Sequence, residues 1–72
     1  MNADDDKADI EETARQYLRA HGRAAVALLM ELAEIDAAAG DELGARTWRD
    51  IAEAAKRILG SVLMAIVALG TR

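Results

Sequence analysis

The chain has 72 residues, of which 53% are hydrophobic and 31% charged, and its formal net charge at pH 7 is −4. This composition is too apolar for a disordered chain, and its acidic balance argues against general affinity for nucleic acid or anionic membranes. Cysteine is absent from the sequence, which excludes disulfides and thiolate metal sites.

A chain of this size forms one small domain, whose core is only marginally stabilising without oligomerisation. Its alanine-rich composition, without proline or phenylalanine, favours helices over strands and predicts an all-α protein. Segment 1–8 is polar and acidic, so we predict a flexible N-terminus that differs from a secretory signal.

A first helix is predicted over 9–21. Asp9 and Glu12 have the spacing of a capping box, and Glu11 and Arg15 form a favourable pair one turn apart. The apolar face of this helix comprises Ile10, Ala14, Tyr17, Leu18 and His21.

The dipeptide His21-Gly22 leaves two alternatives open. Gly22 suits the position just after a helix, with basic residues in the preceding turn. Alternatively, one helix continues to Ala39, and Gly22 costs up to about 1 kcal/mol relative to alanine. We favour a kink or short break, followed by a second helix over 23–39. Its apolar face comprises Ala25, Leu28, Leu29, Leu32, Ile35 and Ala39.

Gly40 and Asp41 mark a clearer boundary. Gly40 suits a left-handed helix end, and Asp41 suits the N-cap of a third helix over 42–69. Thr47 with Asp50 is a second candidate cap, which would move this start six residues on. A connection this short makes the second and third helices antiparallel neighbours. Residues 9–70 therefore form one helical domain, a kinked helical hairpin or three-helix unit that we expect to assemble into a bundle.

The third helix carries an apolar stripe at alternating steps of three and four residues. The stripe comprises Trp48, Ile51, Ala55, Ile58, Val62, Ala65 and Leu69. Charged residues flank it only up to Arg57, and ten of the thirteen residues in 58–70 are aliphatic or Met. A helix that is apolar on every side must be buried in something. Segment 58–70 is about 20 Å long, short of the about 30 Å hydrocarbon core of a membrane, so we expect no span.

This uncharged segment predicts self-association. One face can pack against the first two helices, and comprises Ile58, Leu59, Val62, Leu63, Ile66 and Leu69. The other face would leave a large apolar patch in water, and small residues at 60, 61, 65 and 68 let another backbone approach. We predict a homodimer with the interface residues Ile58, Val62, Met64, Ile66, Val67 and Leu69. Insertion into a larger protein complex and shallow binding at a membrane surface stay open. The membrane is not favoured, because Lys56, Arg57 and Arg72 flank the segment rather than lie within it.

The helix boundaries carry a resemblance. His21-Gly22, Gly40-Asp41, Gly44 and Trp48-Arg49-Asp50-Ile51 follow one another at characteristic spacings. Through them, roughly residues 10–59 resemble a family of small uncharacterised bacterial all-helical proteins. The resemblance implies a compact three-helix or kinked-hairpin unit and brings no known activity. Whatever is particular to this protein is expected in 60–72, beyond the pattern.

No pattern in the sequence predicts catalysis. His21 is the single histidine, and no carboxylate lies three or four residues from it. Glu31 and Glu34 lack the Glu-x-x-His pairs of di-metal bundles, and with Asp36 they suit a solvated face. We therefore expect no enzyme activity, catalytic residue, cofactor or metal.

Arg15, Arg19 and Arg23 form a basic row, but an acidic chain is not expected to bind nucleic acid. Trp48 is expected at the junction of the three helices, and it is a structural residue together with Gly22, Gly40 and Asp41. The sequence thus predicts a non-enzymatic structural or protein-interaction protein. An accessory subunit of a larger complex, at a membrane or away from one, is the alternative, and a small DNA-binding or antitoxin-like regulator is third. We expect a cytoplasmic location, with the periphery of the inner membrane as the alternative.

Overall fold

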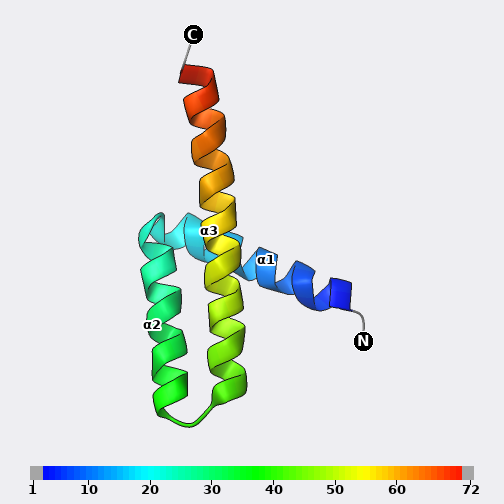
Figure 1. Ribbon diagram of the computed structural model, residues 1–72, viewed down its shortest axis with the longest axis vertical. Coiled ribbons are helices and arrows are strands. Elements are labelled where there is room, and N and C mark those ends of the chain that lie inside the picture. Colours follow the sequence, from blue (N-terminus) through cyan, green and yellow to red (C-terminus); the bar gives the residue numbers. More distant parts are fainter. Residues whose placement is uncertain (1–2, 71–72) are drawn as a thin grey trace.

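The computed structural model describes residues 3–70, which form three α-helices joined by short turns (Figure 1). α1 spans Ala3–His21, α2 spans Ala24–Ala38 and α3 spans Glu42–Gly70. No strand occurs in this part of the chain. The predicted all-α, three-helix fold is confirmed.

α1 begins at Ala3, six residues before the predicted start at Asp9. Residues 3–8 contain no glycine or proline, so nothing in this segment opposes extension of the helix toward the N-terminus. Asp9 therefore lies inside the helix, where its carbonyl oxygen accepts a hydrogen bond from the Thr13 hydroxyl (2.9 Å) instead of opening a capping box. Residues 1 and 2 of the segment predicted to be flexible lie outside the described residues, as does Arg72.

Two glycines end the first two helices. Gly22 has φ 61°, and its N–H donates to the Leu18 carbonyl (2.7 Å), so α1 and α2 are separate helices. Gly40 has φ 84°, and its N–H donates to Ala37 (3.1 Å) while the Asp41 N–H donates to the Asp36 carbonyl (2.8 Å). This pair of bonds is the Schellman arrangement, which satisfies the last carbonyls of a helix.

Asp41 caps α3. Its Oδ1 accepts a hydrogen bond from the Gly44 N–H (2.9 Å), which satisfies one of the first amides of the helix. The alternative cap at Thr47 is wrong, because the Thr47 hydroxyl lies within the helix and donates to the Leu43 carbonyl (3.0 Å). Capping by Asp41 fixes the start of α3 directly after the turn.

α2 lies antiparallel beside the first half of α3, and α1 crosses α3 close to the level at which α2 begins (Figure 1). Alanines fill most of the space between the helices, which allows close approach of the backbones. The core cluster comprises Ala14, Leu29, Ile51, Ala52, Ala54 and Ala55. Leu29 is the largest fully buried side chain among the described residues.

Candidate self-association surface

Residues 60–70 form the exposed end of α3, which we name the C-terminal arm. Figure 1 shows the arm rising alone beyond α1 and α2. Every residue of the arm is exposed, and its large apolar side chains keep between 50% and 77% of their surface in solvent. These side chains are Val62, Leu63, Met64, Ile66, Val67 and Leu69. The arm is therefore an apolar surface carried on a helix with little around it.

The arm continues the stripe that α3 buries in the core. Ile51 is 5% exposed, Ala55 is fully buried, and Ile58 is half-buried against the core cluster. Further along the stripe, Val62 is 50% and Leu69 is 77% exposed. The stripe stays on the same side of α3, but beyond Leu59 no other helix within residues 3–70 covers it.

The prediction that one face of this segment packs against the first two helices is therefore wrong beyond Leu59. Val62, Leu63, Ile66 and Leu69 are exposed. The reason is length: α3 has 29 residues and α2 has 15, which correspond to about 43 Å and about 22 Å of helix. Because the end of α2 lies beside the start of α3, α2 covers only the first half of α3 and does not extend along the arm.

Among the predicted interface residues, Ile58 lies half-buried in the body of the protein, and the other five are exposed on the arm. Val62, Ile66 and Leu69 follow one another at steps of four and three residues, so they share one face of the helix. Leu63 was not among the predicted interface residues. Its 52% exposure adds it to the surface.

The molecule is elongated as a result. Its solvent-accessible surface is 5343 Å², whereas a compact monomer of 7.7 kDa exposes about 4,300 Å². Its radius of gyration is 13.9 Å, against about 11 Å for a compact chain of 72 residues. The shape leaves an excess of about 1,000 Å² of surface relative to a compact fold.

Other exposed apolar side chains are isolated from the arm. Ile35 is 58% exposed on α2, and Leu43 is 74% exposed in the first turn of α3. Single exposed apolar side chains are common on protein surfaces. The 58% exposure of Ile35 matches the 59% exposure of Ile66 on the arm, so Ile35 is a matched control position for substitutions of Ile66.

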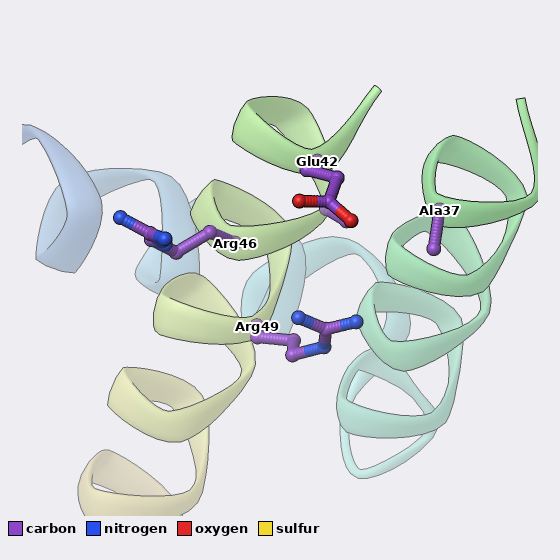
Figure 2. A pocket seen from close by; sticks show the side chains of 5 residues that line it. Ala37, Glu42, Arg46 and Arg49 are labelled. Atoms are coloured by element: carbon purple, nitrogen blue, oxygen red, sulfur yellow. The ribbon is translucent and has the colours of Figure 1, made fainter. Parts of the chain in front are cut away.

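A small pocket of about 140 Å³ lies where the end of α2 meets the start of α3 (Figure 2). Ala37, Glu42, Ala45, Arg46 and Arg49 line it. Figure 2 shows the Arg49 guanidinium reaching toward α2 and the Arg46 side chain pointing away from it. The lining carries both signs of charge and no buried polar group, so it does not define a class of ligand.

The residues considered for catalysis or metal binding lie on two helices, with His21 on α1 and Glu31, Glu34 and Asp36 on α2. His21 is exposed at the end of α1, and its ring lies 5.9 Å from that of Tyr17, which meets Trp48 edge-on at 6.0 Å. Trp48 is half-buried and joins α1 to α3 through this contact. Asp36 is half-buried, unlike the solvated position predicted for it. Among the side chains that the structure describes, those of residues 7–70, no three His, Asp or Glu are placed to hold a metal ion.

Acidic neighbours offset part of the basic row on α1. The Arg15 guanidinium lies 3.5 Å from the Glu11 carboxylate and 3.7 Å from that of Glu12. These pairs are exposed and contribute little to stability, but they reduce the charge that an anionic partner would meet. The row is thus a weak basis for binding nucleic acid.

Across the described part of the chain, no helix has both the length and the hydrophobicity to cross a membrane. Comparison with protein-family models, curated proteins and solved structures finds no match to this chain. The resemblance to small bacterial helical proteins stays a prediction. The physical chemistry of the arm is therefore the basis for a function.

Proposed function

We propose that this protein is a non-enzymatic, self-associating helical protein, in which the arms of two copies pack against each other. One observation carries the proposal: the stripe that is buried in the first half of α3 continues, uncovered, along the arm. An apolar stripe of this kind in solvent is typical of a protein-interaction surface. Val62, Ile66 and Leu69 lie at the centre of the proposed interface, with Met64 and Val67 at its edges.

The arm contributes part of the area that a specific dimer would bury. Stable interfaces bury about 800 Å² on each partner, and the whole molecule, including the projecting part of α1, exposes about 1,000 Å² more than a compact fold. Burial of apolar surface contributes about 25 cal/mol per Å², part of which is offset by the loss of translational and rotational freedom. A second copy presents the same stripe, so a two-fold dimer is self-complementary without any further partner.

A membrane surface fits the arm less well. Helices that lie in the membrane interface carry Lys and Arg along their polar face, and residues 60–70 contain neither. The accessory-subunit alternative needs a second protein to cover the arm. In the homodimer the stripe of a second copy covers the arm, so no other protein is needed. We propose that this dimer forms in the cytoplasm.

The experiment compares two substitutions of equally exposed isoleucines. Ile66→Asp places a charge in the proposed interface, whereas Ile35→Asp places the same charge on α2. Sedimentation velocity is expected to give twice the chain mass of 7.7 kDa for the native protein and for Ile35→Asp. We expect Ile66→Asp to raise the dissociation constant by at least about tenfold, which corresponds to about 1.4 kcal/mol.

A native chain that sediments as a monomer at all concentrations would contradict the proposal. Equal masses for the two variants would contradict it as well, because the interface would then lie elsewhere. A native chain that aggregates unless detergent is present would instead support the accessory subunit of a membrane-associated complex.

A further inference from the structure

The body of the protein lies on the same side of α3 as the stripe of the arm. Ile51 and Ala55 of the stripe are buried by the other helices, and seven residues after Ala55 the stripe reaches Val62. Seven residues are close to two turns of an α-helix, so these side chains point in nearly the same direction. A helix that packs on the stripe of the arm therefore lies on the same side of α3 as α1 and α2, beyond the level that these two helices reach.

This placement restricts how two copies can meet. In a parallel pair, both bodies would lie between the two α3 helices at the same level, and they would keep the arms apart. In an antiparallel pair, the arm of each copy occupies the empty space beyond the start of α2, and each body lies past the tip of the other arm. Figure 1 shows this space beside the arm, above the turn that joins α1 and α2.

We propose, on the basis of the proposed homodimer, that the two arms pair antiparallel, with the partner's arm continuing the line of α2. In this arrangement Ile58 of one copy lies opposite Leu69 of the other, and Val62 lies opposite Ala65. The tip of each arm then reaches the beginning of α2 and the base of the arm in the other copy.

The charges at the helix ends agree with this orientation. The last turn of α3 contains no basic residue, and the carbonyl groups at the end of a helix carry partial negative charge. The first turn of α2 contains no acidic residue, and its N-cap residue Arg23 makes no side-chain capping bond. Antiparallel pairing brings the C-terminal end of the partner's α3 to Arg23 at the start of α2, whereas parallel pairing places the two C-terminal ends at the same level.

The test uses the absence of native cysteine, because an introduced Cys is a unique site for a spin label. Arg46→Cys places the label on an exposed position far from the arm. At about 1.5 Å per residue, the two labels of an antiparallel dimer lie about 50 Å apart along the helix axis. In a parallel dimer the two labels lie at the same level along the helix axis, so only the lateral distance between the two α3 helices separates them. Double electron–electron resonance on the labelled dimer measures this distance.

The three outcomes separate the two proposals. A distance near 50 Å supports the antiparallel pair. A dimer by sedimentation with a short label distance overturns the antiparallel orientation and leaves the proposed function standing. A monomer by sedimentation overturns both.

A charge reversal supplies a second readout. Arg23→Glu is expected to weaken the dimer several-fold, because the partner's negative helix end would meet a carboxylate at the start of α2. The control Arg49→Glu lies at the far end of the hairpin and is expected to leave the dissociation constant unchanged. Equal effects of the two variants would overturn the contact between the tip and α2.

Discussion

The two halves of α3 have the same apolar stripe and different surroundings. In the first half, α1 and α2 bury the stripe, and the opposite face carries charged residues such as Arg49, Glu53 and Lys56. In the second half, the stripe is exposed and no residue of 60–70 is charged. An apolar stripe therefore indicates that a helix will be covered, whereas the lengths of the neighbouring helices decide what covers it.

Truncating a leucine to alanine should lower the free energy of unfolding much more beside the first half of α3 than on the arm. Leu29 is fully buried against the first half, and Leu29→Ala is expected to lower the free energy of unfolding by about 2–5 kcal/mol through lost burial and a cavity. Leu69→Ala on the arm should change it by less than about 1 kcal/mol in the monomer, because no cavity is made. Urea unfolding followed by circular dichroism, at concentrations at which the chain is monomeric, measures both. Similar losses would mean that the arm is packed inside the molecule.

Enlarging an alanine of the stripe tests the same difference from the opposite direction. Ala55 is fully buried, so Ala55→Leu is expected to destabilise the protein by about 1–3 kcal/mol through overpacking. Ala65→Leu makes the same change on the exposed arm and should leave the stability of the monomer within about 0.5 kcal/mol. Thermal unfolding of the two variants gives the comparison. A destabilising Ala65→Leu would show that position 65 is closely packed.

Removing the N-cap of α3 should have a smaller effect on stability than the core substitutions. Asp41→Ala removes the acceptor of the Gly44 N–H and should cost about 1 kcal/mol of stability. Thr47→Ala should cost less, because its hydroxyl only donates to a carbonyl within the helix. If Thr47→Ala proved the more damaging change in chemical denaturation, the helix would begin at the alternative cap.

Substitution of alanine for glycine should change the stability of the protein in opposite directions at Gly40 and Gly60. Gly40→Ala forces a side chain into a φ of 84° and is expected to destabilise the protein by about 1 kcal/mol. Gly60 is helical, with open space around an added Cβ, so Gly60→Ala should stabilise the arm by up to about 1 kcal/mol. Circular dichroism at 222 nm during thermal unfolding reports both. A loss of stability with Gly60→Ala would indicate that the helix is broken at the base of the arm.

Local signals in the sequence predicted much of the fold. The predicted second helix differs from α2 by one residue at each end, because Gly22 and Gly40 are required at positive φ. The predicted start of α1 was six residues late, because the capping-box spacing at Asp9 was taken as the helix start although no glycine or proline in 3–8 interrupts the helix before it. The crossing of α1 over α3 depends on how alanine-rich faces fit together, which no local pattern encodes.

The candidate surface could be predicted only in part. The absence of charge after Arg57 and the spacing of the stripe identify the segment that must be covered. They do not say how far α2 extends along α3. For that reason Val62 and Ile66 were expected to face the first two helices, although both lie beyond them. Periodicity gives the direction of a side chain, and its neighbours follow from three-dimensional packing.

Amide hydrogen exchange measured as a function of protein concentration reports whether a second copy covers the arm. A helical segment of this length is marginal in water unless other groups cover it. We therefore predict that protection of residues 60–70 rises steeply as the protein is concentrated from the micromolar to the millimolar range, and rises less for α2. Protection of the arm that is the same at every concentration would contradict the claim that a second copy covers it.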